Sequence, residues 1–282
     1  MGLLSWVRGD PHASLKAVIG EHELPSFPAV TVRALELIRD EESSVTEMAD
    51  LLASDPGLSV RLLRTVNSTA YGTRRTVESV HQAITLLGRS ELESLVISMA
   101  VGSALPKGPV RGFDPKRFWI TASRRAVTAR ALADCMDPSV RSQCFTAALL
   151  QDMAVPVLAH HRGDPYGEIL ELWHTGSEDL ALLERKEHDW DHALVAAWMA
   201  AQWGMPKLLT DAIRAHHGTH EGDATVLAPV SLVACLREVN EGSAIEQLAS
   251  QAASQLQVAE GEALRLIEKS FEAADQGIAL VA

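Results

Sequence analysis

Apolar residues recur along most of the chain at intervals of three and four, the spacing that places side chains on one face of an α-helix. From Val30, for example, Ala34 and Ile38 follow at intervals of four, with Leu35 and Leu37 beside them. No stretch shows the alternation between turn signals that a β-hairpin requires. The pattern predicts an all-α protein.

Local signals mark where these helices begin and end. Ser44 and Glu47 have the spacing of a capping box, in which each side chain accepts a backbone hydrogen at a helix start. Asp55-Pro56 predicts the next start, with Asp as N-cap and Pro in the first turn. Gly88 is suited to the left-handed conformation and predicts a corner between two further helices.

Turn residues interrupt the periodicity near the middle of the chain: Pro106, Gly108, Pro109 and Gly112. We therefore expect a helical subdomain over 1–108, a second over 109–240 and a C-terminal helical extension over 241–282. After a start at Asp114-Pro115, further helices are expected over 138–150, 165–174, 178–187, 190–203, 206–217, 226–240, 244–256 and 260–274.

Charge and hydropathy limit the classes of function. The chain has 25 Lys and Arg against 37 Asp and Glu, so its net charge of −12 disfavours general binding to nucleic acid or anionic membranes. No apolar run approaches the roughly 20 residues of a membrane span, and the opening apolar segment is too short for a signal-peptide core. We expect a cytoplasmic protein without membrane partners.

The second half gathers residues whose side chains bind metal ions: Asp152, His160, His161, His192, His216, His217 and His220. His192 shares a helix face with Val195 and Met199, and His216 shares one with Ala212, so both are expected to point inward, where they could converge. The alternative is that each is a hydrogen-bonded core residue. His160 and His161 are expected at a solvated helix end.

A series of short motifs in the first half resembles the HDOD family, the HD-related output domains of bacterial signalling: Leu24-Pro25-x-Phe27-Pro28, Asp55-Pro56-x-Leu58, Leu62-Leu63-Arg64, Val66-Asn67-Ser68, Ala70-Tyr71-Gly72 and Ala83-Ile84-x-Leu86-Leu87-Gly88. The second half continues it with Phe145 to Asp152, Asp191-His192-Ala193, Trp203 to Pro206 and Ala212-Ile213-x-x-His216-His217. The resemblance spans about residues 20–240. It implies an N-terminal helical subdomain packed on an HD-like helical bundle.

The sequence departs from the catalytic HD pattern of a His, a His-Asp pair and a later Asp. The matching positions are Ser123, Gln151-Asp152 and Cys235, so only Asp152 could bind a metal as catalytic relatives do. HD hydrolysis requires a metal that activates water. We therefore expect no catalytic residues, no cofactor and no metal; any residual site would use Asp152, His192, His216 and His217.

The resemblance implies a non-catalytic signalling module that acts through protein–protein contacts. Its implied partners are kinases, response regulators or cyclic-dinucleotide enzymes. A homo-oligomer is a further option, since the apolar positions of residues 244–271 are expected either to cap the core or to form a dimer surface. The polar loop of Asn67, Ser68, Tyr71 and Gly72 is a candidate interaction loop between the two halves, or simply a helix stop.

Two other functions compete. A metal-dependent phosphohydrolase or nucleotide-binding site in the HD-like cleft would be helped by Arg124, Arg125 and Arg130, although a solvated helix face is the expected role of these arginines. A helix-turn-helix over 45–67, with Arg61 and Arg64 and the nearby Arg74 and Arg75, would suit DNA. Burial of Leu58, Leu62 and Val66 and the negative charge argue against DNA.

Overall fold

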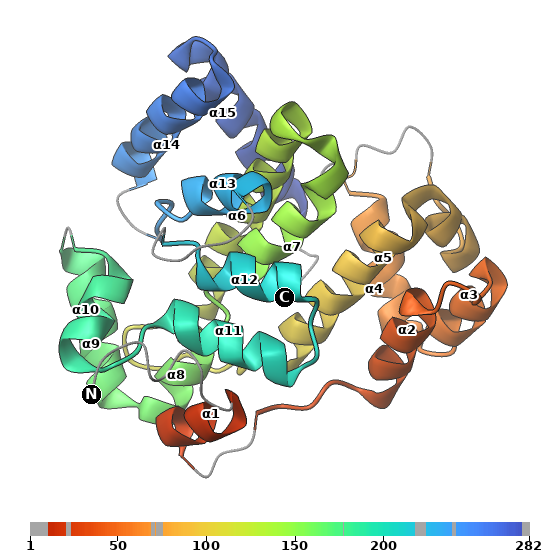
Figure 1. The fold of residues 1–282 in the computed structure, drawn as a ribbon, viewed down its shortest axis with the longest axis horizontal. Coiled ribbons are helices and arrows are strands. Elements are labelled where there is room, and N and C mark those ends of the chain that lie inside the picture. Colours follow the sequence, from red (N-terminus) through yellow and green to blue (C-terminus); the bar gives the residue numbers. More distant parts are fainter. Residues whose placement is uncertain are drawn as a thin grey trace.

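The computed structural model describes residues 11–20, 24–68, 71, 76–176, 178–217, 224–238 and 241–277. Over these ranges the regular structure is helical, and the one β contact is an isolated bridge between Val110 and Phe113. Figure 1 shows one group of helices from the N-terminal part at the right, a larger central and left-hand group, and a C-terminal pair at the top. The predicted all-α fold is confirmed.

The first helices are α1 (Pro11–Ile19), α2 (Ala29–Arg39), α3 (Val45–Ala53), α4 (Pro56–Val66) and α5 (Val80–Ala104). The predicted caps are present: Ser44 and Glu47 form a complete capping box, and Asp55 accepts from the backbone N–H of Leu58 at 2.9 Å. Helices α2, α3 and α4 pack on α5, and α1 lies instead on α11 of the second half. Leu58, Leu62 and Val66 are buried in α4, as expected, so these positions face the core.

Gly88 bends α5. Its φ of 73° and ψ of 174° interrupt the helical conformation, and the two predicted helices run on either side of it. Residues with a side chain larger than a hydrogen atom rarely adopt this backbone conformation, which explains why a glycine stands at this position. The bend lets the long second part of α5 cross into the core of the molecule, where Leu92, Leu95 and Val96 are buried.

The second group comprises α6 (Pro115–Met136), α7 (Arg141–Leu150), α8 (Ala154–Arg162), α9 (Asp164–Thr175), α10 (Leu180–Glu187), α11 (His192–Gln202), α12 (Lys207–Arg214) and α13 (Ala224–Val233). Helices α6 and α7 pack closely together at its centre, where the small side chains of Ala122, Ala126 and Ala129 are buried. The sequence pattern did not separate α8 as a helix of its own. His160 and His161 stand in its last turn, as expected.

A buried polar network joins the first half to the second. Arg130 of α6 donates to Glu91 of α5 at 2.7 Å, and Ser142 donates to the other carboxylate oxygen of Glu91. The Arg130 guanidinium also lies 4.5 Å from the centre of the Tyr71 ring, which contacts Phe145 edge-on. Tyr71 of the candidate interaction loop is therefore packed between the two halves.

The side chains of Asn67 and Ser68, in the same loop, form hydrogen bonds with nearby backbone atoms. The Asn67 side chain accepts from the N–H of Val77 at 2.7 Å and donates to the carbonyl of Val77 at 2.8 Å. Ser68 donates to the carbonyl of Thr65 at 2.7 Å. These contacts give Asn67 and Ser68 a role in closing the loop; Gly72 lies outside the described residues.

The C-terminal helices α14 (Glu241–Leu256) and α15 (Glu260–Gly277) form a hairpin, and α15 packs along α6. Arg124 of α6 donates to both carboxylate oxygens of Asp275 at 2.7 and 2.8 Å and lies over the Phe271 ring. Ile267 and Phe271 are buried, so α15 covers the α6 surface. Within the described residues, no helix has the length and apolar character of a membrane span.

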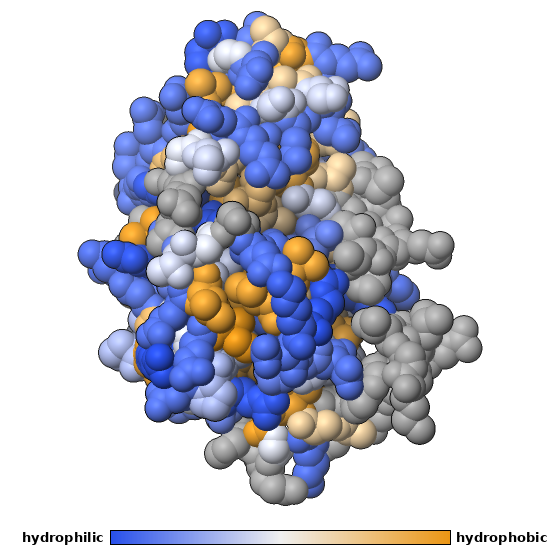
Figure 2. Space-filling model, turned by 90° about the vertical axis from the view of Figure 1, so that its left-hand side faces the viewer, coloured by the Kyte–Doolittle hydropathy of each residue, from blue (hydrophilic) through white to orange (hydrophobic). Residues whose placement is uncertain are grey.

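Exposed leucines mark one face of the second group. Figure 2 views the side on which α9 and α10 lie, and hydrophobic atoms gather near the middle of its lower half with hydrophilic residues around them. Leu172 of α9 is 61% exposed and Leu182 of α10 is 50% exposed, although most apolar residues of these two helices are buried. Large apolar side chains in this position are available for contact with another molecule.

Candidate metal centre

Four side chains with metal-binding atoms meet between α7, α11 and α12. Asp152 stands in the turn between α7 and α8, His192 is the first residue of α11, and His216 and His217 follow α12. His192 and His216 are each 1% exposed. The expectation that His192 and His216 point inward is therefore confirmed, and both rings are also hydrogen-bonded, whereas His220 lies outside the described residues.

The donor atoms lie at the spacing of ligands to one ion. Nε2 of His192 is 3.3 Å from Nε2 of His216 and 2.9 Å from Nε2 of His217. Oδ1 of Asp152 is 3.4 Å from Nε2 of His192 and 3.3 Å from Nε2 of His216. Four donors at tetrahedral positions around zinc lie about 3.3 Å from one another, given zinc–nitrogen distances near 2.0–2.1 Å. The four distances between donor atoms of the cluster, 2.9–3.4 Å, are close to that spacing, and the three histidine donors lie within 4.8 Å of one another.

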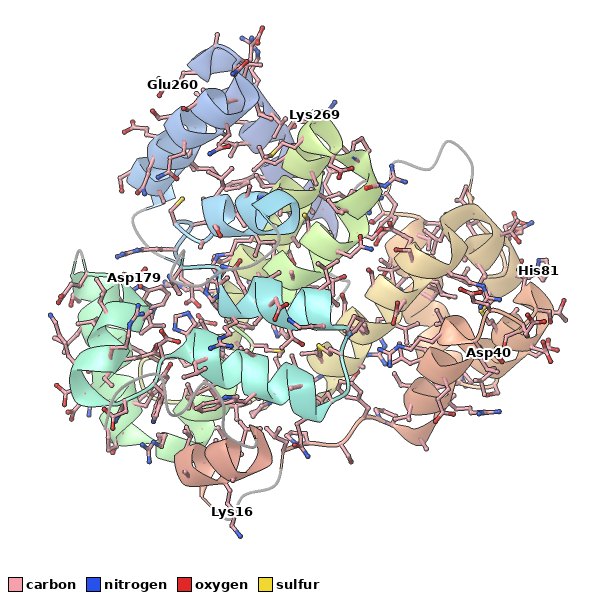
Figure 3. All side chains as sticks on the ribbon, viewed as in Figure 1. Lys16, Asp40, His81, Asp179, Glu260 and Lys269 are labelled. Carbon is pink, nitrogen blue, oxygen red and sulfur yellow. The ribbon has the colours of Figure 1, made fainter. Side chains whose placement is uncertain are left out.

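The other ring nitrogens already have partners, which determines where the hydrogens lie. Nδ1 of His216 is 2.6 Å from the carbonyl oxygen of Ile213, which can only accept, so Nδ1 carries the hydrogen. Nδ1 of His192 is 2.7 Å from the Glu184 carboxylate, and Nδ1 of His217 is 3.5 Å from that of Asp179. In Figure 3, Asp179 is labelled at the start of α10. The Nε2 atoms of the three rings are thus left to face one another.

Local structure fixes the direction of His192. The Asp191 side chain accepts from the N–H of Leu194 at 2.8 Å and so caps α11, which places His192 at the first helical position. Its backbone N–H donates to Glu184 at 2.7 Å, the same oxygen that accepts from its ring. Both ends of the residue are therefore tied to α10.

The cluster strongly perturbs the acidity of its members. Burial opposes ionisation of Asp152, but the Arg125 guanidinium and hydrogen bonds from His192 and His216 hold its pKa well below the usual value. Burial also opposes protonation of His192, yet Glu184 and Asp152 raise its pKa well above 6.5. Burial and the neighbouring His216 lower the pKa of His217. The centre thus stabilises one positive charge on or beside His192.

Arg125 neutralises the outer side of Asp152. Its Nη1 donates to Oδ2 of Asp152, and its Nε donates to the carbonyl of Leu236 at 3.0 Å. Arg125 is 4% exposed, so the expectation that Arg124, Arg125 and Arg130 form a solvated helix face is wrong. Arg125 and Arg130 each pair with a buried carboxylate, and Arg124 pairs with Asp275. The sequence showed the helix face but not the acids that later segments bring to it.

The three positions that the sequence resemblance pairs with HD metal ligands, Ser123, Gln151 and Cys235, offer no imidazole or carboxylate. Gln151 is 1% exposed and neither amide atom has a hydrogen-bond partner. The second carboxylate oxygen of Asp152, Oδ2, accepts from Arg125.

The residues present fit a single divalent ion. The donor atoms of His192, His216 and His217 lie within 4.8 Å of one another, and Oδ1 of Asp152 lies beside two of them. Once the rings have lost their extra proton, zinc, iron or manganese accepts such a donor set. Two of the histidines donate their other ring hydrogen to a carboxylate or carbonyl, the outer-shell arrangement common to metal-bound histidine. An ion at this centre would supply a fixed positive charge and a Lewis acid.

A cavity of about 550 Å³ opens beside the centre. His216 and His217 line one side of it, and Ser231 and Cys235 contribute from α13 and the turn after it. Gln247, Gln251 and Gln255 of α14 also line it. Its size falls in the range of small-molecule sites, and its described lining includes no Lys or Arg.

Family comparison agrees with this architecture. The HDOD domain model matches residues 24–219, which is more than half of the chain. The chain belongs to the HDOD family. The match includes Asp152 and the three histidines of the centre, whereas α13, α14 and α15 lie beyond it.

Solved structures of similar proteins share the fold of this HDOD chain. An HDOD domain protein with unknown function from Geobacter sulfurreducens has a TM-score of 0.72 at 21% identity, with 95% of this chain and 96% of that chain covered. A protein provisionally named a phosphohydrolase, from Shewanella amazonensis SB2B, has a TM-score of 0.73 at 23% identity, with 95% and 98% covered. At these identities the likeness establishes the fold.

A curated relative is longer than this chain. It is an uncharacterized protein of Treponema pallidum (strain Nichols), 22% identical over an alignment of 260 residues, with 89% of this chain and 50% of the relative covered. The chain therefore spans about half the length of the curated relative that it matches.

Proposed function

We propose that this chain is a regulatory HDOD module that binds one divalent metal ion and acts through protein contacts without turning over a substrate. The observation that carries the proposal is the Arg125–Asp152 ion pair. It occupies Oδ2 of Asp152, the oxygen not directed at the histidines, so this oxygen is not free to hold a second ion, and Ser123, Gln151 and Cys235 offer no imidazole or carboxylate for one.

The single ion is proposed from the convergence of Asp152, His192, His216 and His217. Three imidazole nitrogens and a carboxylate within 2.9–3.4 Å repel one another unless a proton or a metal ion lies among them. A buried ion held by residues from three segments would fix α11 and α12 against the α7–α8 turn. The ion would then stabilise the surface that the module presents to its partners.

The test combines metal content with activity. The purified chain should bind one Co²⁺ or Zn²⁺ per molecule and show no hydrolysis of nucleotides or cyclic dinucleotides with added Mn²⁺. Asp152→Asn should lose the ion, and His161→Ala, in the last turn of α8, serves as the matched control. Turnover that disappears in Asp152→Asn would refute the non-catalytic role.

Partners are proposed among bacterial signalling proteins such as kinases, response regulators or cyclic-dinucleotide enzymes, on the basis of family membership. The exposed leucines of α9 and α10 are the proposed contact. Leu172→Ser with Leu182→Ser should reduce capture of a signalling protein from a lysate of the source organism, and Val60→Ser on α4 is the control. Equal capture by both variants would move the contact elsewhere.

A second candidate function is a nucleotide or phosphate-ester site, favoured by the cavity beside His216 and His217. An anionic group in the cavity could reach an ion on the cluster, and the α14 glutamines offer donors and acceptors to an uncharged part. Equilibrium dialysis of nucleoside monophosphates against the metal-loaded protein distinguishes the two candidates. Binding without turnover would add a ligand to the regulatory module, and turnover would replace that proposal.

A further inference from the structure

The fully buried carboxylate of Glu184 has a role that the metal ligands alone do not explain. Glu184 is 0% exposed. Its Oε1 accepts from the Tyr166 hydroxyl at 2.5 Å, and its Oε2 accepts from the backbone N–H and ring Nδ1 of His192, both at 2.7 Å. Among the described residues, Glu184 forms an ion pair with the His192 ring.

A buried negative charge of this kind is unfavourable unless a positive charge lies close to it. Of the acids at the centre, Asp152 is neutralised by Arg125, and Asp191 lies 3.3 Å from Arg185. Glu184 faces the inner side of His192 instead. The negative charge of Glu184 is therefore balanced by a positive charge on the His192 side: a proton on the ring, or an ion bound at Nε2.

The hydrogen bonds also set the direction of that ring. Because Oε2 of Glu184 accepts from both the backbone and the ring of His192, the ring has little freedom to rotate. The Nδ1 hydrogen is held toward Glu184, and Nε2 faces Asp152 and His217. Tyr166 holds the other carboxylate oxygen, which keeps Glu184 in place.

We propose that Glu184 and Tyr166 are positioning residues for the metal centre: they fix the His192 tautomer and supply the buried negative charge that sets the affinity for the ion. The inference rests on the proposed metal centre. Neither residue belongs to the motifs that identify the family resemblance, so this pair extends the site from four residues to six. Outer-shell carboxylates of metal-bound histidines contribute to affinity in the same way.

Glu184→Gln is the decisive variant because it keeps the shape of the side chain and removes its charge. We expect Co²⁺ affinity, measured by calorimetry and by the visible absorption of bound Co²⁺, to fall about 10- to 100-fold. Tyr166→Phe should lower it less. Glu187→Gln, an exposed acid of the same helix, should leave it unchanged. Circular dichroism verifies that each variant is folded.

The structural alternative is that Glu184 only ties α10 to α11. Under that alternative, folded Glu184→Gln binds Co²⁺ with the affinity of the unaltered chain, which would overturn the proposal. If Glu184→Gln does not fold, Tyr166→Phe decides, since unchanged affinity in that variant contradicts the positioning role.

A separate measurement distinguishes failure of the metal centre from failure of the positioning role. Nitrogen-15 spectra of the metal-free chain should show a hydrogen on Nδ1 of His192, whether or not Nε2 is also protonated, and Glu184→Gln should shift the Nδ1 signal. If the unaltered chain binds no Co²⁺, the metal centre is refuted whatever the spectra show. If it binds Co²⁺ but the His192 spectrum is identical in Glu184→Gln, the positioning role is refuted and the metal centre stands.

Discussion

The guanidinium of Arg125 donates to the carboxylate of Asp152 on one side and to the carbonyl oxygen of Leu236 on the other. Removing a single partner from a buried ion pair leaves the other charge unbalanced, at a cost of about 3–5 kcal/mol. Arg125→Met should lower the free energy of unfolding by that amount in urea titrations. Arg124→Met, which breaks a more exposed pair with Asp275, should cost less than about 1 kcal/mol.

The pairing can be verified with a double variant. If Arg125 mainly balances Asp152, then Arg125→Met with Asp152→Asn should be more stable than the sum of the two single effects predicts. Additive losses would show that the Leu236 contact, rather than the ion pair, is what Arg125 contributes.

Metal affinity should rise with pH. His192 has a raised pKa, so in the metal-free chain its ring holds a proton that must leave before Nε2 can bind an ion. Loss of one proton per ion raises the affinity for Co²⁺ about tenfold per pH unit while His192 is still protonated. Calorimetry across the neutral range, in buffers of different ionisation enthalpy, measures both affinity and proton release. An affinity independent of pH would contradict a protonated His192.

The ion pair between Glu91 and Arg130 should stabilise the contact between the two halves of the chain. Both side chains are largely buried, so Glu91→Gln is expected to cost about 3 kcal/mol, with loss of the Arg130 pair and the Ser142 contact. Thermal and urea unfolding measure the loss. Glu36→Gln, which breaks the exposed pair with Arg33, is the control and should have little effect.

Gly88→Ala should destabilise the chain by about 1–3 kcal/mol through backbone strain alone. No atom lies within 4 Å of the place where the added Cβ would stand, so steric contact does not contribute. Gly108→Ala also meets no atom within 4 Å but has no positive φ, and it should be close to neutral. A neutral Gly88→Ala in unfolding experiments would show that α5 can straighten.

The sequence predicted those features that depend on neighbours along the chain. The Ser44–Glu47 capping box and the Gly88 corner are local, and both are confirmed. The inward faces of His192 and His216 followed from helical spacing. The helix α8 was missed because its apolar residues continue those of α7 across a short turn.

The missing parts of the site depend on distant segments. Arg125 looked like a surface residue because its partners, Asp152 and Leu236, come from later in the chain. Glu184 had a local signal that was overlooked: it follows Leu180 by four and Ala181 by three positions, so it shares their buried face. A carboxylate on an apolar face predicts a buried partner, although the identity of that partner needs the fold.

The contact between Arg125 and Leu236 also determines how the protein can be dissected. Leu236 lies 17 residues beyond the end of the family match at 219, and α15, which shields α6, lies farther still. A fragment trimmed to the residues of the family match would leave the guanidinium without its carbonyl acceptor and expose the apolar side of α6 to water. Such a fragment should aggregate, so biochemical work on this protein calls for the C-terminal hairpin to be retained.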